Sequence, residues 1–199
     1  MGKVVAGAGV EDWTSGAVPL SLAVSNMIGV WLFSLMTALG ASISIPLPFT
    51  PVPLTLQTLL VLLSGACLGK GGGAASQTLY ILMGALGMPI WAGGAVGLSR
   101  LSGPTGGYLL AFPLAAWVVG AMMDRESHTA SRRALAAMGL GSVIIYALGL
   151  FQLSIWLHCS LRQGLMLAVL PFLPGDLIKI GAAVLLCRKV GRCWIPETH

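Results

Sequence analysis

Long apolar runs with almost no charge are the feature that most restricts how this chain can fold. Residues 20–43 and 135–157 are each long enough to cross a hydrocarbon core of about 30 Å. Of the 199 residues, 56% are hydrophobic and 9% are charged, which is rare in a soluble domain of this size. The sequence therefore predicts a multi-pass protein of the cell membrane, in contact with the lipid bilayer.

Six apolar segments follow one another and predict an all-α membrane protein of a single domain with six transmembrane helices. A polar segment, residues 1–19, precedes them, and short tracts rich in proline, glycine or charge separate them. The predicted spans are residues 20–43, 54–68, 74–86, 106–123, 135–157 and 175–188.

The basic residues between the spans predict the orientation of the chain. With six spans, only Arg100 and Arg162 fall on the side opposite the two termini. Loops rich in lysine and arginine remain in the cytoplasm, so both termini are predicted to be cytoplasmic. The basic residues on the terminal side are Lys3, Lys70, Arg125, Arg132, Arg133, Arg188, Lys189 and Arg192.

Several functional classes are not predicted. The net charge of +5 comes from short tracts between spans, as in orientation signals, so nucleic acid is not an expected partner. The sequence has no loop with phosphate-binding spacing, and it has no metal-ligand, Ser-His-Asp or paired-carboxylate arrangement at useful spacing. No cofactor, metal or enzymatic activity is therefore expected, although an intramembrane enzyme remains the alternative from another class.

Asp176 and Lys179 place an acid and a base inside the last apolar segment. Pro174 and Gly175 indicate that a helix begins there, with Asp176 in its first turn. The i,i+3 spacing puts both side chains on one helix face. Charges at membrane depth cost roughly 2.5–3.5 kcal/mol each and are commonly functional. The pair is predicted to bind a ligand, and a structural ion pair between helices is the alternative.

Two unusual loops fall on the same predicted outer face as this pair. Residues 45–53 contain four prolines, which cannot continue a helix and predict an extended apolar loop over a cavity. Residues 90–108 are rich in glycine and carry Trp91 and Arg100, so their backbone can press onto a ligand. Together these features predict a ligand pocket near the outer face.

The predicted pocket suits a small amphipathic molecule with an acid and an amide-like head. Asp176 offers it a carboxylate, Lys179 an ammonium and Arg100 a guanidinium. The other side chains predicted to contribute are Gln57, Tyr80, Trp91 and Tyr108.

Small residues recur every fourth position in the first span, at Ser34, Ala38 and Ser42. Such a stripe lets another helix approach closely. It could serve an internal neighbour or a partner protein, and docking of a partner membrane subunit is the hypothesis advanced here.

Four motifs give this sequence a resemblance to a known family. They are PVPLTLQT at residues 51–58, LMGALGMP at 82–89 running into AGG at 92–94, GPTGGY at 103–108, and LPGDLIK at 173–179. In this order they resemble the BioY family, the biotin-binding membrane components of energy-coupling factor transporters.

The resemblance implies six helices that bind biotin near the outer face. It also implies a partner transmembrane protein with ATPase subunits that drives uptake, although some members of the family act without them. Asp176 and Lys179 would be biotin ligands, and the loop carrying Arg100 would help to cover the site. Biotin would be the transported ligand rather than a cofactor, and another small vitamin is the runner-up.

Overall fold

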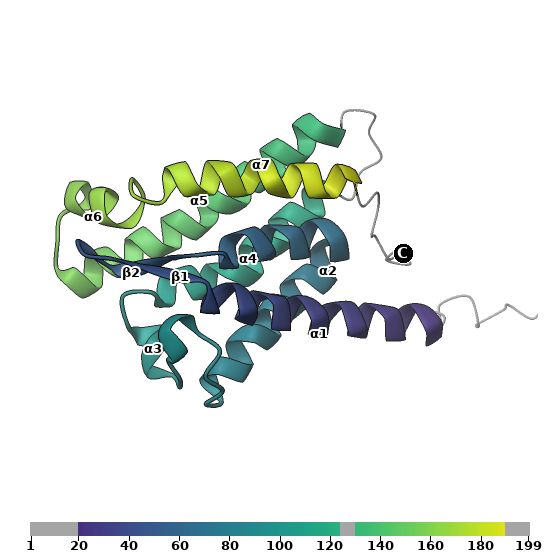
Figure 1. Cartoon of the computed structure of the whole chain (residues 1–199), viewed down its shortest axis with the longest axis horizontal. Coiled ribbons are helices and arrows are strands. Elements are labelled where there is room, and N and C mark those ends of the chain that lie inside the picture. The colour runs from purple at the N-terminus through teal and green to yellow at the C-terminus, as the bar shows by residue number, and fades with distance from the viewer. Residues whose placement is uncertain (1–19, 124–129, 190–199) are drawn as a thin grey trace, which may run out of the picture.

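Helices α1, α2, α4 and α5 form most of the bundle in this computed structural model, which describes residues 20–123 and 130–189. Figure 1 shows α1 beginning and α7 ending at one end of the bundle, with the β1–β2 hairpin and α6 at the other end. In chain order the elements are α1 (Leu20–Ser42), β1 (Ser44–Leu47), β2 (Thr50–Thr55), α2 (Gln57–Ala85), η2 (Ala92–Gly94), α3 (Ser99–Ser102), α4 (Gly106–Met123), α5 (Ala130–Leu157), α6 (Leu161–Ala168) and α7 (Leu173–Lys189).

Helix α2 doubles back on itself at Gly69. This residue has φ 72° and ψ −174°, a region that glycine enters without the steric cost other residues meet. A hydrogen bond of 2.7 Å joins Gln57 Nε2 to Tyr80 Oη, two positions that a straight helix would hold roughly 35 Å apart. The halves touch through glycines, because a Cβ added to Gly73 would lie 2.7 Å from the Gly65 Cα. The two halves of α2 are therefore antiparallel neighbours.

Four helices within residues 20–123 and 130–189 are long and apolar enough to cross a membrane, and α6 with α7, bent by 52°, would add a fifth span. The four are Val24–Ser42, Gln57–Ala85, Gly106–Met123 and Arg132–Leu157. These lengths support the multi-pass membrane protein expected from the sequence. In this set of four, α2 is a single helix, whereas the sequence predicts two spans there, 54–68 and 74–86.

The boundaries of the elements differ from the sequence prediction mainly around α2. The expected turn over residues 69–73 is confined to Gly69, and residues 71–73 are helical. Residues 54 and 55 belong to β2 rather than to a span. Helix α5 extends N-terminally beyond the predicted 135–157, whereas α4 covers the predicted 106–123. Helix α7 begins at Leu173, two residues before the predicted start, and Asp176 lies in its first turn as expected.

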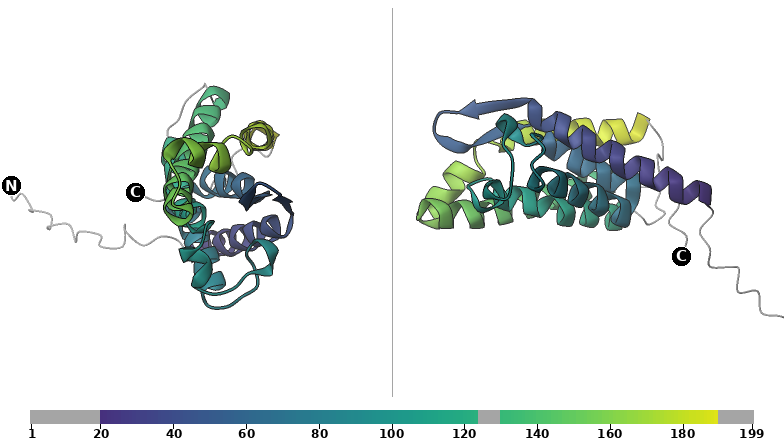
Figure 2. Two further views of the ribbon diagram at one scale, coloured as in Figure 1. Left: turned by 90° about the vertical axis from the view of Figure 1, so that its left-hand side faces the viewer. Right: turned by 90° about the horizontal axis from the view of Figure 1, so that it is seen from below.

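The proline-rich segment is a β-hairpin, which corrects the all-α prediction. Strands β1 and β2 are antiparallel, with Ser44 opposite Thr55 and an irregularity between Ile45 and Leu47. Proline has no N–H for a ladder hydrogen bond, so it is confined to edges and bulges. The sequence predicted extended backbone here but not its pairing. In the end-on view of Figure 2 the hairpin lies between α1 and α7.

The stripe on α1 lies mostly inside the chain. Ser34 is 0% exposed and Ala38 is 9% exposed, whereas Ser42 is exposed. Thr37, on the same face, accepts a hydrogen bond from Gln77 of α2 at 3.2 Å. The burial of Ser34 and Ala38 within the chain favours the alternative of an internal neighbour, and Ser42 is the member of the stripe left exposed.

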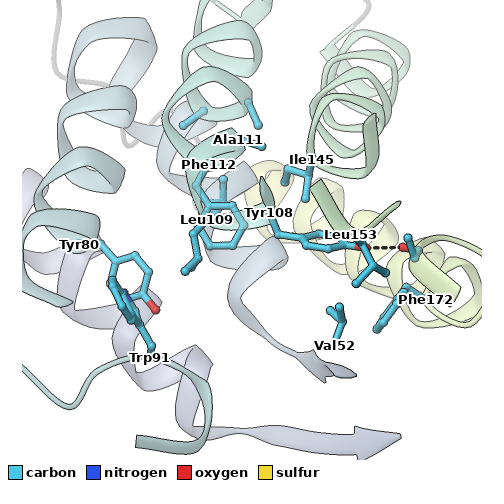
Figure 3. Close-up of a cluster of buried hydrophobic side chains, with 14 of the residues drawn as sticks. Val52, Tyr80, Trp91, Tyr108, Leu109, Ala111, Phe112, Ile145, Leu153 and Phe172 are labelled. Carbon is cyan, nitrogen blue, oxygen red and sulfur yellow. Dashed lines mark hydrogen bonds between the residues drawn. The ribbon is translucent and has the colours of Figure 1, made fainter. Parts of the chain in front are cut away.

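The larger apolar core lies beside the hairpin and joins α2, α4, α5 and the segment before α7. Figure 3 shows Tyr80 and Trp91 together at one side of this core, with Val52 and Phe172 at the other. Tyr80 also stacks on Phe112 of α4, with ring centroids 6.5 Å apart. A second core lies among α2, α4, α5 and α7. The first of these cores forms the wall of a cavity.

Candidate functional site: a charged pocket at the hairpin end

A cavity opens between β2, the start of α2, the 91–105 loop, α4, α5 and the start of α7. Its volume is about 590 Å³ including the open solvent at its mouth. It is lined by Val52, Pro53, Leu54, Thr55, Gln57, Thr58, Trp91, Ala92, Arg100, Thr105, Tyr108, Leu109, Phe112, Ile145, Tyr146, Phe172, Asp176 and Lys179. Six of the seven predicted ligand-binding residues are in this lining, and Tyr80 is not.

The acid and base predicted from the sequence form an ion pair on α7. Lys179 Nζ lies 2.5 Å from Asp176 Oδ1, and the two residues are 8% and 5% exposed. Thr58 of α2 bridges them, because its hydroxyl accepts from Lys179 Nζ at 3.1 Å and donates to Asp176 Oδ1 at 3.3 Å. A buried ion pair needs such extra hydrogen bonds to offset the desolvation of its charges.

Tyr146 of α5 completes this group, and the sequence prediction missed it. Its hydroxyl donates to Asp176 Oδ2 at 2.5 Å. The only signal in the sequence was a phenol interrupting the apolar span 135–157. We call Asp176, Lys179, Thr58 and Tyr146 the Asp176 cluster. It draws side chains from α2, α5 and α7 to one end of the cavity.

Arg100 lies on α3 and also lines the cavity. Its Nη2 donates to the carbonyl of Ala92 at 3.4 Å, and its buried Nε has no hydrogen-bond partner among the described residues. Within residues 20–123 and 130–189 the sequence has one carboxylate side chain, Asp176, which is already paired with Lys179. The described part of the pocket therefore carries one guanidinium without a carboxylate to balance it.

Two further unpaired polar groups share the lining with Arg100. Trp91 is 2% exposed and Thr105 is 8% exposed, and neither Trp91 Nε1 nor Thr105 Oγ1 has a hydrogen-bond partner in the described structure. Buried polar groups are nearly always hydrogen-bonded. Trp91 Nε1 lies on the Gly84 side of its ring, so the Arg100 guanidinium is the group in this part of the lining that carries a positive charge toward an anion.

Tyr80 supports the pocket from behind rather than lining it. Its hydroxyl accepts from Gln57 Nε2 at 2.7 Å and donates to the Ile90 carbonyl at 3.3 Å, which fixes the residue before Trp91. The Trp91 ring lies so close to Gly84 that a Cβ there would overlap it. Gln57 and Trp91 reach the cavity, as predicted, and Tyr80 holds them in place.

Tyr108 and Gln152 fix the other walls. The Tyr108 ring lines the cavity, and its hydroxyl donates to the Ala168 carbonyl of α6 at 2.7 Å (Figure 3). Gln152 of α5, a polar interruption to which the sequence assigned no role, donates through Nε2 to the carbonyls of Leu101 and Gly103 at 2.7 and 2.8 Å. These bonds anchor the loop that carries Arg100.

The fold and the pocket define a class: a membrane protein with a cavity lined by a buried acid-base pair and by a guanidinium that no carboxylate of the described residues balances. Comparison with known proteins is consistent with this class. The model of the BioY family matches residues 14–195. Biotin transporter BioY of Thermotoga maritima is 40% identical over 165 residues, which cover 83% of this chain and 95% of that protein. Biotin transporter BioY of Rhodobacter capsulatus is 36% identical over 185 residues, covering 84% and 93% of the two chains.

The chain belongs to the BioY family. A solved structure has the same fold, a crystal structure at 2.1 Å described as the S-component for biotin from an ECF-type ABC transporter. Its TM-score is 0.81 at 24% identity, over 87% of this chain and 94% of that one. The family resemblance seen in the sequence motifs is thereby confirmed.

Proposed function

We propose that this protein captures biotin from outside the cell as the substrate-binding component of an energy-coupling factor transporter. The observation that carries the proposal is the distribution of charge in the pocket, where the acid-base pair has no net charge and no carboxylate in residues 20–123 and 130–189 is left to balance Arg100. Biotin has the complementary groups, since its cyclic urea offers N–H donors and a carbonyl, and its side chain ends in a carboxylate. Relatives named biotin transporters support transport over the alternative of an intramembrane enzyme.

In this proposal Asp176 accepts from the urea and Lys179 donates to its carbonyl. Arg100 pairs with the carboxylate. Guanidinium and carboxylate match in geometry as well as in charge. Apolar side chains from β2 and α4 enclose the fused rings and alkyl chain.

The proposed topology has six crossings with both termini in the cytoplasm and the pocket facing outward. It counts the two halves of α2 as separate crossings, which their reversal at Gly69 supports, and α7 as the last. The basic residues Lys70, Arg132 and Arg133 then lie on the cytoplasmic side, as positively charged loops do. The membrane is the plasma membrane, and the proposed partners are a transmembrane coupling subunit and ATPase subunits.

Calorimetry on the purified protein in detergent or nanodiscs tests the proposal. Wild-type protein is expected to bind biotin much more tightly than biotin carboxamide or vitamins without a cyclic urea, since the carboxamide leaves Arg100 unpaired. No heat of binding with biotin, or equal affinity for an unrelated vitamin, would contradict it.

The Arg100 assignment has its own prediction. Arg100→Gln is expected to weaken biotin binding roughly 30-fold or more, because a buried charge pair is worth about 2–5 kcal/mol. The same variant is expected to bind biotin carboxamide within threefold of wild type, which serves as the internal control. Equal losses for both ligands would show that Arg100 acts on the loop rather than on the carboxylate.

A further inference from the structure

Hydrogen-bonding capacity at the Asp176 cluster is nearly used up by its own members. An ionised carboxylate offers about four lone-pair sites. Asp176 Oδ1 accepts from Lys179 and from Thr58, and Oδ2 accepts from Tyr146. One acceptor site therefore remains for a ligand, and it is on Oδ2.

The donors can be counted in the same way. A lysine ammonium has three N–H donors, and Lys179 directs two of them to Asp176 Oδ1 and Thr58 Oγ1. The Thr58 proton is directed at Asp176 Oδ1, and the Tyr146 proton at Oδ2. The cluster thus offers a ligand one acceptor beside one donor, which complements a single N–H next to a C=O.

We propose that Tyr146 is a specificity-determining residue. Its hydroxyl occupies one of the two acceptor sites on Asp176 Oδ2, so the pocket can hydrogen-bond only one N–H/C=O edge of a cyclic urea. The inference rests on the proposed function and deepens it, because it narrows the recognised head group to a cyclic amide edge. The second urea N–H makes no bond to Asp176. A lactam with its N–H on the recognised edge satisfies the cluster, and a lactam with its N–H on the other edge leaves Oδ2 unpaired.

Two analogues of biotin separate these cases, each with one of the two urea N–H groups replaced by CH₂. Wild-type protein is expected to bind one lactam within about tenfold of biotin and the other at least about 30-fold more weakly than the first, because a site built for an N–H strongly rejects a ligand without it. Affinities of the two lactams within threefold of each other would overturn the proposal that only one acceptor site on Asp176 is open to the ligand.

Tyr146→Phe keeps the ring and removes only the hydroxyl. It is expected to weaken biotin about tenfold, since the carboxylate loses a charge-assisted hydrogen bond, and to reduce the ratio between the lactams to below about fivefold. Tyr108→Phe is the matched control, because it removes another pocket hydroxyl that binds the Ala168 carbonyl instead of the carboxylate. Whatever affinity it loses, its lactam ratio is expected to stay at the wild-type value.

The ratio of the two lactam affinities distinguishes specificity from mere structural support, which would change both affinities together. A wild-type ratio in Tyr146→Phe, or an equal reduction in Tyr108→Phe, would overturn the role of Tyr146. Should Tyr146→Phe not fold, Thr58→Val frees a site on Oδ1 and is expected to lower the ratio too, and an unchanged ratio there would overturn the proposal. Absence of biotin binding to wild type would instead overturn the proposed function itself.

Discussion

Two buried polar clusters join α2 to its neighbours, and only one of them faces a cavity. The Gln77 cluster lies between the halves of α2 and α1, where Gln77 Nε2 donates to Thr37, Ser64 and Ser76 at 3.1–3.2 Å. All four side chains are 0% exposed, and none of them lines the pocket. The Asp176 cluster instead combines charged and neutral groups at the wall of the cavity.

The comparison shows how the same kind of hydrogen-bonding group serves structure in one place and recognition in another. In the Gln77 cluster each hydroxyl donates its proton to a backbone carbonyl, so Thr37, Ser64 and Ser76 can only accept from Gln77. No donor is left over there, and Gln77 Oε1 alone lacks a partner among the described residues. By the count above, the Asp176 cluster retains one donor and one acceptor, and its four members line the cavity.

The largest effect on biotin binding is expected from removing a charge from the Asp176 cluster. Asp176→Asn and Lys179→Met should each weaken biotin binding roughly 30-fold or more, since losing a charged partner in a desolvated site costs about 2–5 kcal/mol. Calorimetry on each purified variant measures this loss. The double variant, in which neither charge remains unpaired, is the control for misfolding. If thermal unfolding showed that the variants are less stable while calorimetry showed that they still bind biotin, the pair would be only structural.

Removing the donor of the Gln77 cluster should lower stability and leave biotin binding unchanged. Gln77→Ala is expected to destabilise the protein by about 1–3 kcal/mol, because it leaves buried hydroxyl oxygens without their donor. Biotin affinity should stay within threefold of wild type. Thermal unfolding in detergent measures the first quantity and calorimetry the second. Thr78→Ala, which removes an exposed hydroxyl one residue along the same helix, should change neither.

A loss of affinity in Gln77→Ala without a loss of stability would remove the distinction between the clusters. An unchanged midpoint of unfolding would mean that the hydroxyls find other donors. Either result would indicate that burial alone does not separate structural from ligand-binding polar groups in this fold.

The two clusters also differ in how far the sequence could predict them. Asp176 and Lys179 stand three positions apart along one helix, so their shared face follows from helical geometry alone. Tyr146 is remote in sequence, and its partner depends on how α5 packs beside α7. Ser34 and Ala38 left two interpretations open for a related reason: small residues allow close approach to any helix, whether in the same chain or in a partner.

The loops could be predicted only in outline. Proline spacing in residues 45–53 excludes a helix but does not say which strand pairs with which. The glycine-rich loop, residues 90–108, is tied to the bundle at three positions, because Gln152 donates to the carbonyls of Leu101 and Gly103 and the Gly97 N–H donates to the Gly84 carbonyl. Glycine content permits flexibility, but side chains elsewhere in the sequence determine whether it is retained.

The smallest expected effect is on the reactivity of the β1–β2 hairpin, if the hairpin acts as a lid over the Asp176 cluster. Trp91 is already 2% exposed, so closure cannot bury it further, whereas Phe49 at the turn between β1 and β2 is 56% exposed. Lids commonly close over bound ligands, and four prolines stiffen this segment, so we expect the hairpin to move as a unit. With the native cysteines replaced, Phe49→Cys should react with a polar thiol reagent at least several-fold more slowly when biotin is bound. A cysteine in place of Leu86, which is 85% exposed at the end of α2, is the control and should react equally in both conditions. Equal rates at Phe49→Cys would mean that the hairpin does not close and that biotin enters by another path.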